Sequence, residues 1–237
     1  MTTPHQNAGV VSARERRLPA LFPFELLAFA LIFWADAAGY VPLSKTPFLL
    51  VVAWVSLRAR GLSWRLAGLS IDPDWRRLAI IGCLAGVGFW LFEYFVENPV
   101  LHAITGRYPD LSDFGALVGN IPLLLVLLAL NIVLAGFGEE MVWRGYALSR
   151  VAQLLGGGKG WLVSLVLVNL SFGFAHLYQG EAGVVQAAVQ GVLLGLLYLR
   201  TGRNLIAPIC AHIVANTCDF LLIYAGSHVG TTGRFPF

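Results

Sequence analysis

Runs of apolar residues separated by short polar segments make up most of this chain. An α-helix needs about 20 predominantly apolar residues to cross the hydrocarbon core of a bilayer, and several runs approach that length. The pattern predicts seven transmembrane helices, over residues 22–40, 46–58, 78–96, 120–148, 160–178, 182–200 and 204–225. The second helix is the shortest, and Pro42 and Pro47 lie at its start. The expected fold is therefore all-α, a polytopic bundle of transmembrane helices.

Composition excludes an ordinary soluble protein, because 57% of the 237 residues are hydrophobic and only 12% are charged. The basic residues then predict the orientation of the helices. All but three of the 16 Lys and Arg residues fall in the segments on one side of the bundle, the exceptions being Lys45, Arg107 and Arg234. Basic residues concentrate on the cytoplasmic side of membrane proteins. We therefore expect an integral protein of the plasma membrane, with a cytoplasmic N-terminus and an outer C-terminus.

The polar segments divide the chain into regions. Residues 1–20 are polar and basic, which predicts a disordered cytoplasmic tail, and residues 21–237 are expected to form one membrane-embedded domain. Residues 58–77 combine Trp and Leu with Arg, as in a segment lying on the membrane surface, and a role as an anchoring linker is favoured. The odd number of cysteines argues against a disulfide framework, so we expect small packing residues at Cys83, Cys210 and Cys218.

Two adjacent glutamates, Glu139 and Glu140, follow the longest apolar run. Ionisable groups inside a membrane are costly, so they usually face the interior of the bundle and mark a functional site. Glu140 and Arg144 are four residues apart, hence on one helix face, where they can form an ion pair. Glu139 is rotated about 100° from Glu140 on an α-helix and lacks this partner. The alternative is that both acids are solvated at a cytoplasmic helix end.

Two further polar motifs lie in the later helices. Phe172 and His176 are four residues apart in one, and His212 and Asn216 are four apart in another. A single intramembrane histidine is more often a hydrogen-bonding residue than a catalyst. Counted along each helix from its basic end, however, Glu139, His176 and His212 reach the middle of the membrane, His176 with the poorest fit. The motif-bearing core therefore covers about residues 120–225.

Such a cluster contains the groups that peptide hydrolysis requires. A buried glutamate can take a proton from water, and a neutral histidine can hold that water or pass the proton on. A second histidine and an asparagine amide can donate hydrogen bonds to the oxyanion that forms on the scissile carbonyl. No nucleophilic serine or cysteine is needed.

The three motifs, Glu139-Glu140-x-x-x-Arg144, Phe172-x-x-x-His176 and His212-x-x-x-Asn216, resemble the signature of the CPBP intramembrane proteases. That family includes the type II CAAX prenyl endopeptidases and the Abi bacteriocin-processing proteins. Many members have eight spans, so the resemblance widens the expected count to seven to eight.

The resemblance also implies a role for each motif residue. Glu139 would be the catalytic base that activates water, assisted by His176. His212 and Asn216 would donate hydrogen bonds to the oxyanion. The supporting residues would be the pair Glu140 and Arg144, together with Phe172, which would shape the site.

Several alternatives stay open at this point. No cofactor is expected, although zinc held by Glu139, His176 and His212 is a less favoured possibility, since the sequence lacks an HExxH motif. The expected partners are the lipid bilayer and a peptide or membrane-protein substrate, prenylated or not, with no nucleic acid; the oligomeric state is left open. The rival function is a non-enzymatic immunity or scaffold protein that uses the same polar cluster to bind a partner.

Other polar residues in the predicted helices have simpler explanations. Asp219 lies seven residues after His212, so it either orients that histidine or forms a pair near the outer rim. Asn131 could line the same cavity, but hydrogen bonding between helices is favoured. Rim positions or packing contacts explain Glu25, Asp36 and Glu93 adequately. No role is assigned to the histidines outside the helices, His5, His102 and His228.

Overall fold

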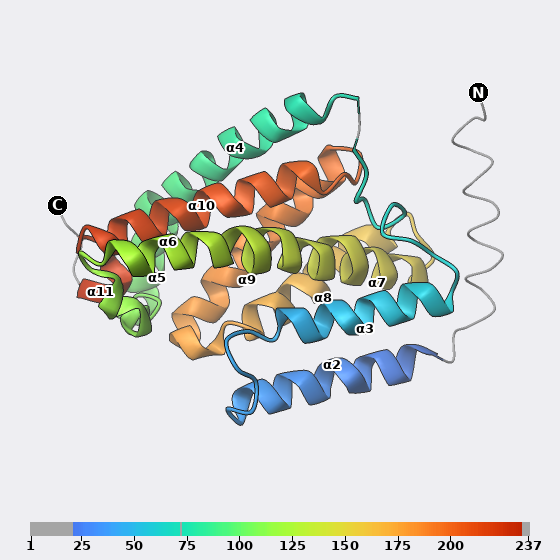
Figure 1. Cartoon of the computed structure of the whole chain (residues 1–237), viewed down its shortest axis with the longest axis horizontal. Helices are drawn as coiled ribbons and strands as arrows, with labels where there is room; N and C mark the ends of the chain where they lie inside the picture. Colours follow the sequence, from blue (N-terminus) through green and yellow to red (C-terminus); the bar gives the residue numbers. More distant parts are fainter. Residues whose placement is uncertain (1–20, 72, 234–237) are drawn as a thin grey trace.

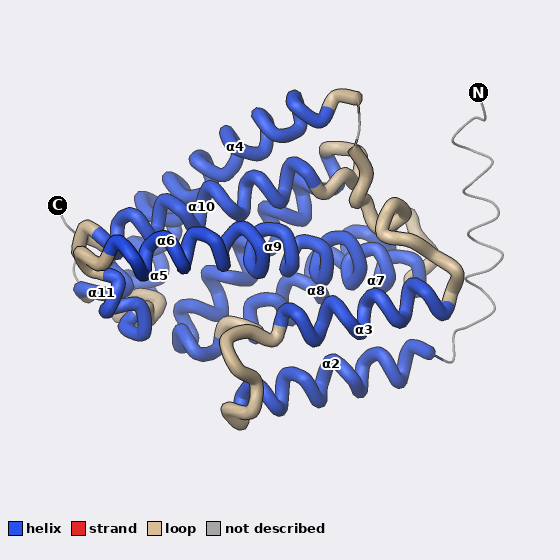
Figure 2. Tube along the Cα trace, viewed as in Figure 1, coloured by secondary structure: helices blue, strands red, loops and turns tan. Residues whose placement is uncertain are grey.

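The computed structural model of the protein describes residues 21–71 and 73–233, so the predicted tail over residues 1–20 lies outside the described residues. All regular elements in the described part are helices. They run back and forth between two ends of a bundle, and most of the connecting loops lie at these ends (Figures 1 and 2). The predicted all-α class is thus confirmed.

Seven helical segments form the bundle in the described residues: α2 (Phe22–Ala37), α3 (Thr46–Ala59), α4 (Trp75–Phe92) continued by η2 (Glu93–Glu97) and α5 (Asn98–Thr105), α6 (Ile121–Leu130) continued by η4 (Asn131–Glu139), η5 (Met141–Leu148) and α7 (Ser149–Leu154), α8 (Gly160–Phe174), α9 (Gly180–Arg200) and α10 (Ile206–Tyr224). Short helical turns add η3 (Ser112–Leu117), η6 (Leu177–Gln179) and α11 (Val229–Thr232).

Four helices in the described part are long and apolar enough to cross a membrane: Trp75–Thr105, Ile121–Leu154, Leu177–Arg200 and Ile206–Tyr224. Two further apolar helices, α3 and α8, are shorter. The protein is therefore an integral membrane protein with at least four candidate spans. The count of seven to eight spans stays a prediction.

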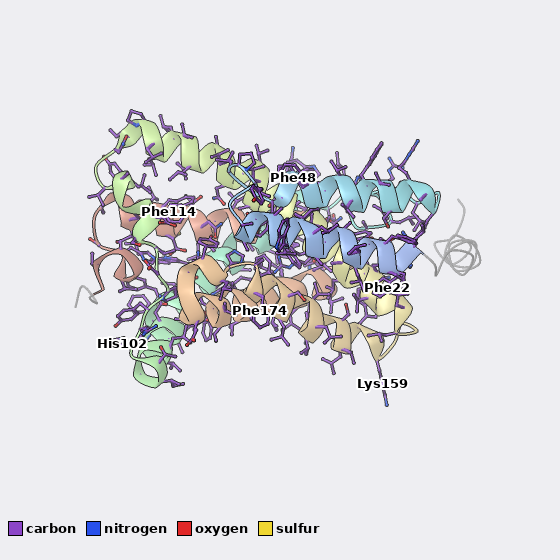
Figure 3. The ribbon with its side chains drawn as sticks, turned by 90° about the horizontal axis from the view of Figure 1, so that it is seen from below. Phe22, Phe48, His102, Phe114, Lys159 and Phe174 are labelled. Atoms are coloured by element: carbon purple, nitrogen blue, oxygen red, sulfur yellow. The ribbon has the colours of Figure 1, made fainter. Side chains whose placement is uncertain are left out.

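Large apolar side chains cover the outside of the bundle, as expected of a surface that faces lipid. Leu84 and Phe174 are 69% and 66% exposed, values that would be unusual for a run of such residues in water. Figure 3 shows Lys159 extending from one end of the bundle and His102 near the opposite end. The segments around Lys159 and His102 thus lie at opposite ends of the helices.

Several helix boundaries differ from those predicted, three of them at helix ends that bear on the site. The third helix continues to Thr105, beyond its predicted end at residue 96, and Pro99 lies just after the π-helical turn η2. The fourth continues to Leu154, six residues beyond the predicted end. In contrast, α8 ends at Phe174 after 15 residues, or about 22 Å, which is less than the hydrocarbon core of about 30 Å.

Small residues bring the late helices together. A Cβ atom on Gly86 of α4 would lie 2.5 Å from the carbonyl oxygen of Ala211 on α10, and one on Gly173 of α8 would lie 2.5 Å from that of Val184 on α9. Only glycine permits such close backbone contact. The largest buried cluster includes Trp143 and Phe172, so the main hydrophobic core lies among the motif-bearing helices.

The segment between α3 and α4 packs on the end of the bundle. The Leu205 backbone N–H donates to the Gly68 carbonyl at 3.0 Å, and Asn204 donates to the Ser70 carbonyl at 3.2 Å. Trp64 packs against the core. Protein contacts therefore hold this segment, consistent with an anchoring linker.

Buried polar contacts join the first two helices to the motif helix. Glu25 of α2 accepts a hydrogen bond from Ser56 of α3 at 2.7 Å and forms an ion pair with Arg60. The Tyr146 hydroxyl of η5 donates to Ser56 at 2.8 Å. The packing role expected for Glu25 is therefore confirmed.

Candidate active site

The motif glutamates lie in an unusually wide stretch of helix. The backbone is π-helical over Asn131–Glu139 and again over Met141–Leu148. π-Helical turns are rare and frequently occur at functional sites. Gly136 and Gly138 allow close approach here, since a Cβ atom on Gly138 would lie 2.7 Å from Thr46 Cγ2. The α-helical geometry assumed from the sequence is wrong for this segment, because the wider turn rotates successive side chains by a smaller angle.

Glu140 is completely buried and has two cationic or polar partners. Arg144 Nη1 donates to Glu140 Oε1 at 2.7 Å, so the predicted pair is present. His212 Nδ1 lies 2.7 Å from the same oxygen. The guanidinium also donates to the Gly191 carbonyl at 3.1 Å. These contacts connect the motif helix to α9 and α10, and they exclude the alternative that Glu140 is solvated at a helix end.

Phe172 lies at the centre of the motif residues. Its ring centroid is 4.7 Å from the ring of His176 and 6.5 Å from that of His212. The Arg144 guanidinium carbon lies 4.7 Å from the same centroid, within the range of a cation–π interaction. A Cβ atom on Gly191 would approach the Phe172 ring to 3.0 Å. The aromatic ring therefore packs against both histidines and the buried cation.

His176 follows the end of α8, in the turn that leads to α9. Its Nδ1 lies 2.9 Å from the Phe172 carbonyl oxygen. A carbonyl can only accept, so Nδ1 carries the proton and the neutral ring has a free lone pair at Nε2. Because α8 ends at Phe174, His176 lies in the turn that follows and lines the same cavity as Glu139. Its position was the poorest fit to the prediction from the sequence.

His212 and Asn216 lie one turn apart on α10. The Asn216 amide donates to Asn131 Oδ1 at 3.1 Å, which uses one of its two N–H groups. Asn131 in turn donates to the Ile213 carbonyl at 3.0 Å and to Thr217 at 3.2 Å. Asn131 thus makes the predicted hydrogen bonds between helices. Its contact with Asn216 was not foreseen.

Glu139 contrasts with its neighbour because it makes no hydrogen bond or ion pair with the described residues. It lines an inner cavity of about 240 Å³ together with His176, His212 and Asn216. The structure therefore brings all four predicted catalytic residues to one cavity, which also excludes full solvation of Glu139 at a helix end.

A second, larger cavity meets the first at Glu139. This groove, of about 1160 Å³, runs between α2, α3, η5 and α8 and is lined mainly by apolar residues such as Phe29, Phe33 and Trp143. Glu139, His176 and Tyr178 line both cavities. Tyr178 was not singled out in the sequence, since nothing in its spacing distinguishes it from other aromatic residues.

The donor atoms of Glu139, His176 and His212 do not form a compact metal-binding group. In the described part of the chain, the one set of three such donors within 4.8 Å of one another consists of Glu93, Asp219 and His228. The Nδ1 atoms of both motif histidines already have partners.

The remaining predicted polar residues fall elsewhere. Asp219 lies 3.3 Å from His228 Nε2, so the expected pair is present, and Asp219 makes no hydrogen bond to His212 in the described residues. His228, which was given no role, is buried against Asp219 and Tyr94. Asp36, for which a rim position or a packing contact was expected, forms an ion pair with Lys45 at 2.8 Å. His102 stacks on Tyr108.

The fold and the site together define a polytopic membrane protein with a buried polar cavity suited to acid–base chemistry. A family model, described as type II CAAX prenyl endopeptidase Rce1-like, matches residues 121–218, a range that contains all three motifs. Residues 121–218 are thus similar to the Rce1-like family, in agreement with the resemblance of the three motifs to the CPBP proteases. Searches of curated proteins and of solved structures found no match. The family match supports a CAAX-type intramembrane protease that acts on a peptide or protein substrate.

Proposed function

We propose that this protein is a glutamate-dependent intramembrane endopeptidase, with Glu139 as the general base. The observation that supports this most strongly is the difference between the adjacent glutamates. Glu140 is buried with Arg144 and His212, whereas Glu139 faces the cavity without a hydrogen-bond partner in the described residues. A catalytic base needs an available carboxylate within reach of water, and of the two only Glu139 provides one.

In this mechanism a water molecule binds between Glu139 and the free Nε2 of His176. Glu139 takes a proton from the water as the oxygen attacks the scissile carbonyl carbon, and the carbonyl oxygen becomes an oxyanion. When the C–N bond breaks, the same proton passes to the leaving amine. Proton transfer by a positioned side chain contributes roughly 10²–10⁴-fold to the rate.

Asn216 and His212 would stabilise the oxyanion. The second N–H of the Asn216 amide is available for this purpose, because the first is bound to Asn131. His212 donates to Glu140 through Nδ1, so Nε2 can donate to an oxyanion only when both ring nitrogens carry protons. Glu140 accepts from Nδ1 and would orient the ring for this role, much as a carboxylate orients the histidine of a catalytic triad. Glu140 would therefore support catalysis through His212.

The apolar groove is the proposed path of the substrate. It extends from Glu139 to Glu25 and Arg150 near the basic end of the bundle, which favours access partly from the cytoplasmic side. An apolar wall suits a lipidated peptide, a leader peptide or a membrane-protein segment. The first assay should therefore test these three substrate classes separately.

The test is cleavage of a quenched fluorescent peptide library by the detergent-purified protein. The library contains prenylated and unmodified peptides, and each assay is repeated with Glu139→Gln, with a strong zinc chelator and with the control Glu181→Gln, which neutralises an exposed acid on α9. We expect cleavage that survives the chelator and Glu181→Gln but is lost in Glu139→Gln.

The other outcomes separate the alternatives. Loss of cleavage with the chelator, restored by added zinc, would replace the proposed mechanism with a zinc-dependent one. Full activity of Glu139→Gln would refute the role of Glu139 as the base. Failure to cleave any peptide, together with tight binding of one of them, would favour the non-enzymatic immunity or scaffold function.

A further inference from the structure

The inner cavity has an acidic end that the proposed mechanism does not use. Glu93 and Asp219 line the cavity beyond the motif residues, and the ligand atoms of Glu93, Asp219 and His228 lie within 4.8 Å of one another. The three come from distant parts of the sequence: the π-helical turn after α4, the second half of α10 and the residue that caps α11.

Glu93 is the acid at this end without a partner. It is only 8% exposed, and it makes no hydrogen bond or ion pair with the described residues. Its neighbours each make one hydrogen bond: Glu97 accepts from Gln190 at 3.1 Å, and Asn98 accepts from Gln186 at 2.7 Å, while Glu97 Oε1 and Asn98 Nδ2 have no partner in the described residues. A buried carboxylate without a partner is costly, so its presence beside a cavity points to a ligand.

The charges around the cavity specify a cation. Its lining includes the acids Glu93, Glu139 and Asp219 but neither Lys nor Arg. Two carboxylates as close as Glu93 and Asp219 repel one another when both are ionised, and a cation between them would remove this repulsion. The expected ligand is therefore positively charged and approaches through the cavity that contains the catalytic residues.

The hydrogen bonds of His228 distinguish an organic cation from a metal ion. The Gly230 backbone N–H donates to His228 Nδ1 at 3.0 Å, so Nδ1 has no proton. The proton of the neutral ring is therefore on Nε2, directed at Asp219. A ligating histidine would need a lone pair at Nε2 and would donate its other N–H. His228 instead holds Asp219 in place, which leaves two carboxylates to accept hydrogen bonds from an ammonium or guanidinium group.

We propose that Glu93 and Asp219 form a subsite for a Lys or Arg side chain of the substrate, with His228 as a positioning residue. This proposal rests on the proposed function. Asp219 lies three residues after Asn216 and seven after His212 on α10, or about 5 and 10 Å along the helix axis. An extended peptide advances about 3.3 Å per residue. The basic residue is therefore within about three positions of the scissile bond.

The experiment measures binding separately from cleavage. Fluorescent apolar decapeptides carry a single Lys, Arg or norleucine at successive positions, and their binding to Glu139→Gln protein is followed by anisotropy. The same titrations are repeated with double variants that combine Glu139→Gln with Glu93→Gln, Asp219→Asn or the control Glu181→Gln. Thermal unfolding verifies that each variant is folded. Cleavage of the same peptides is measured with Glu139 intact.

We expect Lys or Arg at one position to tighten binding roughly tenfold or more over norleucine, since hydrogen bonds to charged groups are strong. Glu93→Gln and Asp219→Asn should each remove most of this preference, and Glu181→Gln should retain it. Absence of any preference, or its persistence in both folded subsite variants, would overturn the proposal.

Two further results are distinguishable. Cleavage without a charge preference would refute the subsite and leave the protease function intact, whereas a Glu93-dependent preference without cleavage would refute only the protease function. Dialysis against Zn²⁺ or Mn²⁺ tests directly whether this site binds a metal ion. One bound ion per chain that is lost in Glu93→Gln would replace the organic cation with a metal ion.

Discussion

The two ends of the inner cavity differ in whether their buried acids have partners. At the motif end, Glu140 is completely buried, and one of its oxygens contacts both Arg144 and His212. At the acidic end, Glu93 is nearly as buried but has no partner in the described residues, and Asp219 has only His228. A buried acid with a fixed cation holds helices together, whereas a buried acid without one is available to a ligand. Glu139, at the motif end, also has no partner in the described residues and therefore belongs to the second kind.

Removing the fixed cation should have the largest effect on stability. Arg144→Ala leaves the buried Glu140 with His212 as its remaining partner, and loss of one partner of a buried ion pair costs about 3–5 kcal/mol. We expect a lower yield of folded protein and a lower unfolding temperature in detergent. Arg77→Ala, which removes an exposed arginine at the start of α4, is the control. A well-folded and fully active Arg144→Ala protein would contradict the pairing argument.

Removing a proposed oxyanion donor should affect turnover more than folding. Asn216→Ala takes away the amide N–H, and loss of one such donor typically reduces kcat by roughly 10²–10³-fold. The measurement is kcat and KM on the best peptide from the library. A change confined to KM would show that Asn216 binds substrate rather than the transition state.

A smaller effect is expected from the residue that orients Asn216. Asn131→Ala removes the acceptor for the Asn216 amide and should lower kcat by about tenfold, the value of one hydrogen bond of ordinary strength. The double variant with Asn216→Ala should be no slower than Asn216→Ala alone, because the two residues act through one donor. Additive losses would assign Asn131 a separate role.

The smallest effect is expected at the acidic end, from the loss of the positioning residue His228. His228→Ala removes the hydrogen bond to Asp219 and the cap of the short helix α11, which together should cost about 1–2 kcal/mol of stability. The preference for a Lys-bearing peptide should fall by only a few-fold, because both carboxylates remain. An undiminished preference would separate His228 from the subsite.

The sequence predicted the motif end far better than the acidic end, for physical reasons. Glu140 and Arg144 are neighbours on one helix face, and that spacing survives the change from an α-helical to a π-helical backbone. The motifs of α8 and α10 likewise keep their residues within one turn. Local spacing of this kind can be read directly from a sequence.

Contacts between distant segments could not be predicted in this way. Glu93, Asp219 and His228 share no local pattern, and their meeting depends on the π-helical turn after α4 and on the turn between α10 and α11. The position of His176 depended on where α8 ends, and its apolar sequence gives no stop signal at Phe174. Helix ends and long-range contacts were therefore the parts that required the structure.

The most direct test of the central claim compares Glu139→Gln and Glu140→Gln in the same two assays, thermal unfolding in detergent and cleavage of one library peptide. Glu139→Gln should unfold at the temperature of the unmodified protein and lose cleavage, because an amide cannot take a proton from water. Glu140→Gln should unfold at a temperature several degrees lower, because it leaves Arg144 buried without its carboxylate. Cleavage by Glu139→Gln, or a Glu140→Gln protein as stable as the unmodified one, would contradict the division of roles between the two glutamates.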